Sequence, residues 1–359
     1  HSLYIYGGMT VTLDLNGHTI NRGLTKETAK VMGRVITVDT NGTLTIRDSS
    51  YNSTLAKNTA PENLANLPFG KIKGGANIDI NDSNRMGGGI AVKYNATLNF
   101  YGGIVTNNYC QGNGGGIFVT GGAKLNFYDG IVCNNFSDDN GASIYTSQAT
   151  VNIYDGIIAN NSSHRTAGLR AFNKSTLTVT GGIIANNTSC IEGNDVWSQS
   201  THAGGISLSS SSILNLNGGT IKNNKNATNG VGGIMVETID CLINISGNPQ
   251  IYDNTNAENT KSGIHIAKDY KIRIDGKLEK NEVSAKIAVN LAYDYDIFKP
   301  FTVGYSYYGN KNMPPSKYFW SYNEDESFAV KNDEVVLSRA TTSIYDYVYL
   351  DSNNERHNY

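Results

Sequence analysis

The sequence predicts an all-β chain that folds as a right-handed parallel β-helix, a solenoid of three sheets with loop insertions and an irregular C-terminal cap. Three observations predict this fold. A marker of glycines followed by Ile or Leu recurs about every 26 residues, which is the period of a repeat architecture. Each unit contains short runs that alternate apolar and polar residues, as strands do. Each unit also ends in a pair of Asn residues, where the chain must turn.

The strands of one coil follow each other in a fixed order. The first strand begins at the apolar marker, which recurs at Ile90, Ile117, Ile144, Leu169, Ile206, Ile234 and Ile264. The second strand has inward apolar residues that should stack from coil to coil, at Leu98, Leu125, Val151, Leu177, Leu214 and Ile243. The third strand ends in the Asn pairs, whose side chains tolerate left-handed backbone and can hydrogen-bond to the next coil. Three strands in each coil predict three parallel sheets.

The ends and the interruptions of the repeat set the domain organisation. Residues 11–20 and 33–48 predict the first two coils, and the repeat fades from about residue 285 into Tyr-rich sequence, which predicts a cap over the open end. We therefore expect a single domain over residues 1–340 and a C-terminal extension over 341–359. Insertions of about 49–86 and 188–203 should leave the solenoid at the same corner, just before the first strand. Pro61 can begin a short helix in the first of them.

Composition excludes several classes of function. The net charge is −2 and no basic block is present, so nucleic acid is not the expected partner. No apolar stretch is long enough to span a membrane, so no membrane insertion is expected within this sequence. The sequence opens inside a strand, so we expect an export signal and an anchor to lie outside it. The four cysteines have no metal-ligand spacing and predict buried thiols.

The repeat resembles a known group of proteins. The run of residues 12–20, TLDLNGHTI, the GGGI units and the GGIIANN unit of residues 181–187 resemble the β-helix repeats of large surface proteins of gut Firmicutes. The late stretch that contains Phe319, Ser327, Val330 and residues 335–337 resembles the same proteins. The resemblance covers most of residues 10–340 and implies display on the bacterial cell surface. Members of this group include adhesins and carbohydrate-active enzymes, so the resemblance does not fix an activity.

Charged residues and the insertion around residue 190 predict one binding edge. The insertion supplies Glu192, Asp195, Trp197 and His202. The same corner, one and two coils earlier, carries Asp138, Asp139, His164 and Arg165. Because successive coils lie ~4.8 Å apart, these residues should line one edge.

An aromatic column should adjoin this edge on the first strand of each coil. With the apolar markers pointing inward, Phe118, Tyr145 and Arg170 point outward on adjacent coils, and Phe172 also points outward two residues along. An exposed aromatic column beside charged groups suits a sugar, because aromatic faces pack on pyranose rings while charged groups bind the hydroxyls. The alternative is that the stacked aromatic residues only stabilise the sheet.

These features favour an extracellular binding module or adhesin that presents a face for a host or dietary glycan or glycoprotein. The ligand-binding candidates are Phe118, Tyr145, Arg165, Arg170, Phe172, Trp197 and His202. A glycoside hydrolase or polysaccharide lyase is the alternative, with Asp138, Asp139, Asp195 and His164 as catalytic candidates. A structural stalk is the third reading. We expect no cofactor and no metal site, although Ca²⁺ could serve a lyase.

Overall fold

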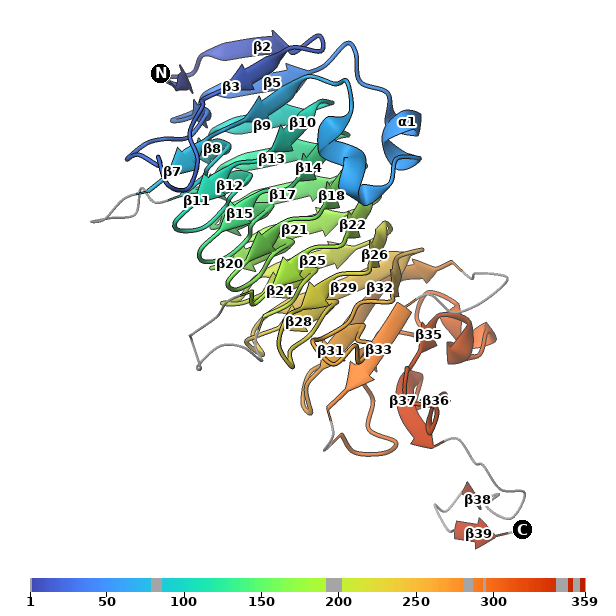
Figure 1. Ribbon diagram of the computed structural model, residues 1–359. Coiled ribbons are helices and arrows are strands. Elements are labelled where there is room, and N and C mark those ends of the chain that lie inside the picture. Colours follow the sequence, from blue (N-terminus) through green and yellow to red (C-terminus); the bar gives the residue numbers. More distant parts are fainter. Residues whose placement is uncertain are drawn as a thin grey trace.

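The computed structural model is a parallel β-solenoid whose coils stack along one axis (Figure 1). It describes residues 2–78, 86–191, 202–279, 287–292, 295–339, 348–350 and 356–358. Three long sheets and one short sheet run down the stack, and we name them A, B, C and D. The predicted fold class is confirmed, and the two-residue strands of sheet D are an addition that the sequence pattern did not predict.

Sheet A is formed by the first strand of each coil. Its strands are β1 (Leu3–Ile5), β4 (Ile36–Val38), β8 (Ile90–Lys93), β12 (Ile117–Thr120), β16 (Ile144–Ser147), β20 (Leu169–Phe172), β24 (Ile206–Leu208), β28 (Ile234–Val236) and β31 (Ile264–Ile266). The apolar markers pair with one another from coil to coil, as Ile117 does with Ile90 and Ile144. They are buried in the main core, so their predicted inward orientation is confirmed.

Sheet B is formed by the second strand of each coil and has ten strands. They are β2 (Thr10–Asp14), β5 (Thr43–Arg47), β9 (Thr97–Phe100), β13 (Lys124–Phe127), β17 (Thr150–Ile153), β21 (Thr176–Val179), β25 (Ile213–Leu216), β29 (Leu242–Gly247), β32 (Ile272–Leu278) and β34 (Thr302–Val303). The predicted inward stack is confirmed, because Leu98, Leu125 and Val151 pair in register and are fully buried.

Sheets C and D complete each coil. Sheet C contains β3 (Thr19–Asn21), β6 (Lys71–Lys73), β10 (Ile104–Thr106), β14 (Ile131–Cys133), β18 (Ile157–Ala159), β22 (Ile183–Ala185), β26 (Thr220–Lys222) and β30 (Gln250–Tyr252). Sheet D contains β7 (Ala76–Asn77), β11 (Tyr109–Cys110), β15 (Phe136–Ser137), β19 (Ser162–Ser163), β23 (Thr188–Ser189) and β27 (Lys225–Asn226).

A buried Asn ladder marks the corner between sheets C and D. The first residue of each pair has a positive φ, for example 54° at Asn134 and 57° at Asn160. The second residue is buried, and its amide donates to the side-chain oxygen of the next coil, as Asn135 Nδ2 does to Asn161 Oδ1 at 3.0 Å. The predicted turn ladder is therefore confirmed.

The first insertion differs from the prediction. A regular third strand, β6, lies inside the segment 49–86, because Ile72 is in register with Ile20 and Val105. Residues 49–70 leave the solenoid between sheets B and C and form α1 (Ser53–Lys57) and the 3₁₀-helix η1 (Pro61–Asn66). We expected this insertion to leave the solenoid at the same corner as residues 188–203, and that expectation is wrong for residues 49–70. The short helix predicted at Pro61 is confirmed.

This first insertion covers the outer face of sheet C (Figure 1). Ala56, Leu64 and Phe69 are buried against Ile131 and Ile157, which point away from the main core. Outward apolar residues on this part of sheet C therefore have a partner within the chain, and the insertion is a fixed part of the fold.

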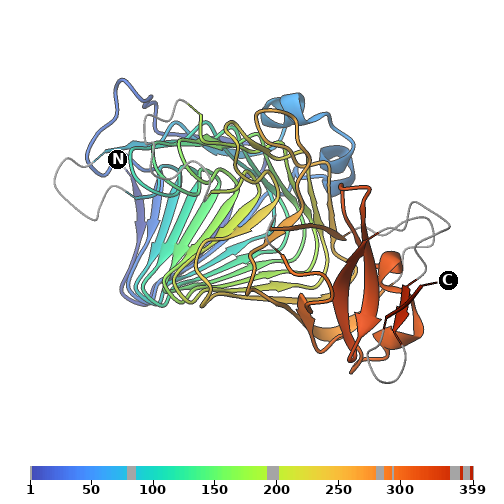
Figure 2. The ribbon, with the colours of Figure 1, turned by 90° about the horizontal axis from the view of Figure 1, so that it is seen from below.

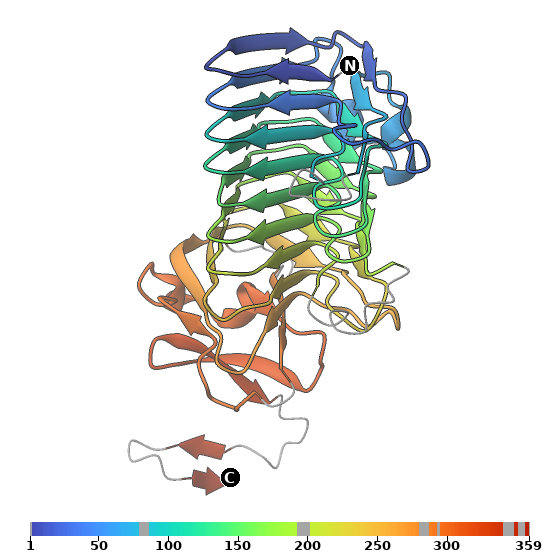
Figure 3. The same cartoon turned by 90° about the vertical axis from the view of Figure 1, so that its left-hand side faces the viewer.

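The C-terminal end of the core is closed by an aromatic cap (Figures 2 and 3). Here β33 (Ile287–Leu291) pairs with both β30 and β31, so sheets A and C join. The cap also contains η2 (Asn310–Asn312), η3 (Pro315–Lys317), β35 (Phe319–Trp320) and the antiparallel pair β36 (Glu326–Lys331) and β37 (Glu334–Arg339). Phe301, Tyr305 and Phe319 are fully buried in it. Beyond the cap, β38 (Val348–Leu350) and β39 (Arg356–Asn358) form a separate antiparallel pair.

The four cysteines are buried thiols, as the sequence predicts. Burial raises the pKa of the Cys110 thiol to about 12 and that of Cys133 to about 11, so both are protonated at neutral pH. The thiols of Cys110 and Cys133 are therefore not activated as nucleophiles.

Candidate functional site

The predicted column on sheet A has the expected register but not the expected exposure. Phe118 pairs with Tyr145, and Tyr145 with Arg170, and the two aromatic rings stack at 5.6 Å between centroids. Phe118 is only 4% exposed, Tyr145 7% and Arg170 6%, while Phe172 is partly buried. The prediction of an exposed aromatic column is therefore wrong, and the alternative that these residues stabilise the sheet fits their burial.

Tight glycine turns explain why this column is buried. Gly114 and Gly141 have φ values of +77° and +62°, and the turns that contain them fold back over the outer face of sheet A. A Cβ atom on Gly114 would lie 2.8 Å from Cβ of Phe118, and one on Gly141 would lie 2.7 Å from Cβ of Tyr145. The aromatic residues thus form a small second core with Ala91, against which Met86 and Phe172 also pack.

Arg170 and His202 belong to a buried ionic cluster. Both contact the carboxylate of Glu237: Arg170 through Nη1, and His202 through Nδ1 at 3.0 Å. Burial and the nearby guanidinium groups lower the pKa of His202 to about 3, and burial lowers that of Arg170 to about 10. The imidazole is therefore neutral, and with Nδ1 facing a carboxylate we assign its proton to that atom. Glu237 was missed, because nothing local in the sequence marks it as the partner of two distant residues.

The predicted edge is only partly assembled. Asp138 lies in a network in which Tyr109 donates its hydroxyl to Oδ2, Lys26 Nζ lies 3.0 Å from Oδ1, and His164 Nδ1 lies 3.9 Å from Oδ1. Asp139 pairs with Arg165 at 3.1 Å. Both carboxylates are thus engaged by cations, which does not favour either as a general acid.

The inserted loop supplies the rest of the predicted edge. Glu192, Asp195 and Trp197 lie outside the described residues, so their place at this edge stays a prediction. The described ends of this loop, at Ile191 and His202, do lie between sheets D and A as the sequence predicts.

The outer face of sheet B carries a regular row of polar side chains. A column of amide side chains runs along it, in which Asn126 Nδ2 donates to Asn99 Oδ1 at 2.8 Å and Asn152 Nδ2 donates to Asn126 Oδ1 at 3.0 Å. Asn244 and Asn215 continue the column in later coils at 2.8 Å. Asn99 and Asn152 are partly exposed and keep hydrogen-bonding capacity towards solvent, whereas Asn126 is buried within the column.

A tyrosine rail borders this amide column, and we define it as Tyr101, Tyr128 and Tyr154. The rings stack on three successive coils, with centroids 4.3 and 4.8 Å apart and planes within 8° of parallel. Tyr101 is 48% exposed and Tyr154 42% exposed. Desolvation and the adjacent Tyr128 hydroxyl raise the pKa of Tyr101. The rail was missed, although the recurrence of Tyr one residue after the second strand could have revealed it.

The rail lies beside the first insertion. Tyr51 donates its hydroxyl to Asp129 at 2.8 Å, and Lys57 Nζ lies 2.6 Å from Asp155 Oδ2. These two aspartates directly follow Tyr128 and Tyr154 in the chain. Burial and the Asp129 carboxylate raise the pKa of Tyr51, so it stays a hydrogen-bond donor. The insertion is therefore held against the same coils that carry the rail.

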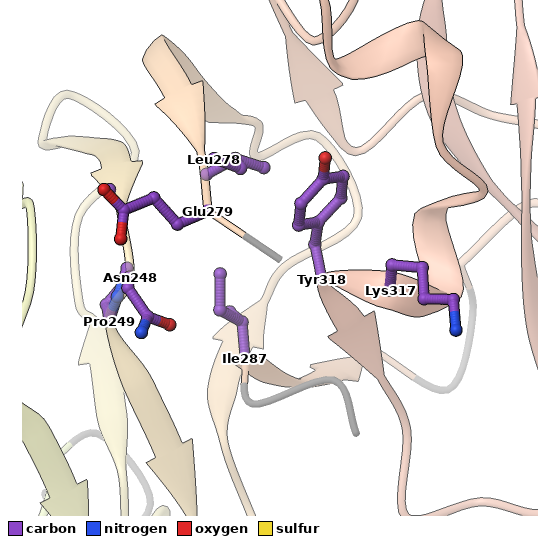
Figure 4. Close-up of a pocket in the computed structure, with 8 residues that line it drawn as sticks. Asn248, Pro249, Leu278, Glu279, Ile287, Lys317 and Tyr318 are labelled. Atoms are coloured by element: carbon purple, nitrogen blue, oxygen red, sulfur yellow. The ribbon is translucent and has the colours of Figure 1, made fainter. Parts of the chain in front are cut away.

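A small cleft lies between the last coils and the cap (Figure 4). It is lined by Asn248, Leu278, Glu279 and Tyr318, and its volume is about 10 Å³. Space of this size fits a water molecule and not a sugar ring. We therefore do not assign a ligand to it.

In the described ranges, no group of three or more His, Cys, Asp or Glu residues is placed to hold a metal ion. No helix among the described residues is long and apolar enough to cross a membrane.

The fold and this geometry define the class of protein as a parallel β-solenoid with an aromatic, amide-rich face. Comparison with known protein families, with curated proteins and with solved structures finds no match for the chain.

Proposed function

We propose that this chain is a glycan-binding module, and that its ligand lies on the outer face of sheet B along the tyrosine rail. The observation that carries the proposal is the rail itself, three stacked tyrosines of which the outer two are almost half exposed. A rail of this kind offers ring edges and hydroxyls along its length and a ring face at each end. The neighbouring amides supply donors and acceptors for sugar hydroxyls.

The charge distribution favours a neutral glycan or glycoprotein glycan. Around the rail, Asp129 and Asp155 are engaged by Tyr51 and Lys57, and Arg47 at the top of the column is paired with Asp14 at 3.2 Å. Lys57 offsets the charge of Asp155 and Arg47 that of Asp14, whereas the neutral Tyr51 leaves the charge of Asp129 in place. These groups therefore offer an acidic polysaccharide no net attraction. The polysaccharide-cleaving alternative is less favoured, because Asp138 and Asp139 are engaged by Lys26 and Arg165.

Display on the surface of a bacterial cell, as an adhesin, is the second part of the proposal. It depends on the resemblance of the repeat to surface proteins of gut Firmicutes. A solenoid holds a binding face along a rigid axis, which suits attachment to host or dietary glycans.

The test is a glycan array probed with the wild-type chain and with Tyr128→Thr. Thr180 occupies the same position of a later coil, so the substitution copies a residue that the fold already accommodates. We expect a defined set of bound glycans, with affinity lost by at least about tenfold in the variant, which corresponds to ~1.4 kcal/mol. Tyr307→Ala is the matched control, because Tyr307 is 84% exposed on the cap and distant in sequence from the rail.

A third variant, Trp197→Ala, separates this face from the edge that the sequence predicted. Loss of glycan binding in Trp197→Ala with full binding in Tyr128→Thr would place the site on the inserted loop and overturn the rail. Absence of any bound glycan would leave the chain as a structural stalk or a protein-binding surface.

A further inference from the structure

A second cluster of aromatic and charged residues lies on the opposite side of the coils, on the outer face of sheet D. The ammonium group of Lys26 is held there by three side chains. Nζ lies 3.0 Å from Asp138 Oδ1, 4.8 Å from the centroid of the Phe136 ring and 5.4 Å from that of Tyr109. An alkylammonium group is thus bound by one carboxylate and two aromatic rings, the combination that recognises organic cations.

We call Tyr109, Phe136 and Asp138 the cage around the Lys26 ammonium group. The coils, and not Lys26, hold these three side chains in place. Tyr109 and Phe136 pair in register on β11 and β15, and their rings stack at 6.0 Å with planes 12° apart. Tyr109 donates its hydroxyl to Asp138 Oδ2, and the backbone N–H of Asp138 donates to Cys110 O at 2.9 Å. His164 packs edge-on against Phe136 at 5.4 Å. Removal of Lys26 would therefore leave the cage formed.

Lys26 belongs to an exposed loop between β3 and β4. The loop is tied to the solenoid near its ends, where Leu24 N–H donates to Gly74 O at 2.8 Å and Lys30 N–H donates to Ala76 O at 3.1 Å. Between these points the backbone turns on itself, because Thr25 N–H donates to Thr28 Oγ1 at 2.8 Å. The Lys26 side chain is 50% exposed, whereas that of Asp138 is 22% exposed. Lys26, which occupies the cage, is therefore more accessible to solvent than Asp138, which forms part of it.

We propose that Tyr109, Phe136 and Asp138 form a binding site for a primary ammonium group of a ligand, and that Lys26 fills this site in cis until the ligand displaces it. Two sources carry this chemistry, a lysine side chain of a partner protein and an amino sugar with a free amine. A neutral amide cannot replace them, because it forms neither the ion pair with Asp138 nor the cation–π contacts. The site is separate from the tyrosine rail, and the proposal does not depend on glycan binding there.

The experiment uses the full chain with Lys26→Ala, which empties the cage. NMR titration with Nα-acetyl-lysine methylamide and with glucosamine tests the two sources, and N-acetylglucosamine and the Nε-acetylated lysine probe are the neutral controls. We expect saturable binding of at least one amine at millimolar concentrations. Binding to the wild-type chain should be at least about twofold weaker, because a tethered side chain at a millimolar effective concentration competes with an amine of millimolar affinity.

A second variant, Lys26→Ala with Asp138→Asn, keeps the aromatic rings and removes the carboxylate. Loss of amine binding in this variant, with an unchanged thermal midpoint relative to Lys26→Ala, would support the cage. The proposal is overturned if neither amine binds Lys26→Ala, if the neutral probes bind equally well, or if Asp138→Asn leaves binding unchanged. Tyr128→Thr should not alter amine binding, so failure of the rail and failure of the cage are distinguishable.

Discussion

Replacement of Asn161 by Ala should destabilise the solenoid strongly, because this residue links three coils from a fully buried position. Its Nδ2 donates to Val132 O and Ala159 O at 3.0 Å and to Asn187 Oδ1 at 2.9 Å. Its Oδ1 accepts from the backbone N–H of Asn135 at 3.0 Å. The substitution leaves the Asn135 N–H and the Val132 carbonyl without these partners, at ~1–3 kcal/mol for each buried group. For the two groups together we expect a loss of about 2–6 kcal/mol.

Asn152→Ala is the matched control for this prediction. Asn152 lies in the same coil and also belongs to an amide column, where Nδ2 donates to Asn126 Oδ1 at 3.0 Å. It is only partly buried on the open face of sheet B, so water can replace the lost bond, and we expect a cost below about 1 kcal/mol. Urea unfolding followed by circular dichroism measures both variants, and native-state hydrogen exchange shows whether the change is local to the coil. Equal costs for the two variants would refute the reasoning.

Three further predictions concern the core and the buried ionic cluster. Phe127→Ala should cost about 3–5 kcal/mol, because the ring is fully buried and stacks on Phe100 at 5.3 Å; a loss below 1 kcal/mol in chemical denaturation would contradict this. Glu237→Gln should cost about 3 kcal/mol or more, because it leaves the buried Arg170 charge without a counter-charge, whereas Asp155→Asn at the exposed Lys57 pair should cost less than about 1 kcal/mol by the same assay. The pKa of His202 falls from 6.5 in the unfolded chain to about 3 on folding, so the unfolded chain binds the extra proton. Stability from this residue should therefore be complete above about pH 6.5 and decline as the pH falls towards 3, and thermal melts of His202→Gln should lack that part of the decline.

Where apolar and polar residues alternate along a strand, the side of the sheet that each residue faces could be assigned from the sequence. Alternation alone fixes which side of a strand a residue occupies, so the inward stack of Leu98, Leu125 and Val151 follows directly. The strand β6 was hidden, because it has only three residues and a single inward apolar side chain, Ile72. A pattern of this length cannot be told from a loop by periodicity.

Exposure on the outer side was harder to predict than orientation. Phe118 and Tyr145 do point outward, yet the turns at Gly114 and Gly141 fold over them. The direction in which a glycine turn leaves a strand depends on its backbone angles, which the sequence does not specify, because glycine accepts positive and negative φ alike. Glu237 was missed for a different reason. It lies 67 residues from Arg170 and 35 from His202 in the chain, so only the coil stacking brings them together.

The tyrosine rail is not required by the fold that carries it, and the solenoid itself supplies the comparison. The backbone at Tyr154 donates to Phe127 O, and the backbone at Thr180 donates to Ile153 O, each at 2.9 Å. Both positions thus have the same pairing in successive coils, yet one carries an exposed aromatic ring and the other a small hydroxyl. A purely structural role would predict lower stability for a coil in which Thr replaces Tyr, because the ring stacking is lost. If Tyr128→Thr melts at the wild-type temperature and loses its ligand, the three tyrosines serve binding alone. If it melts lower and no ligand is ever found, the rail is a stabilising stack of the kind seen at Phe118 and Tyr145.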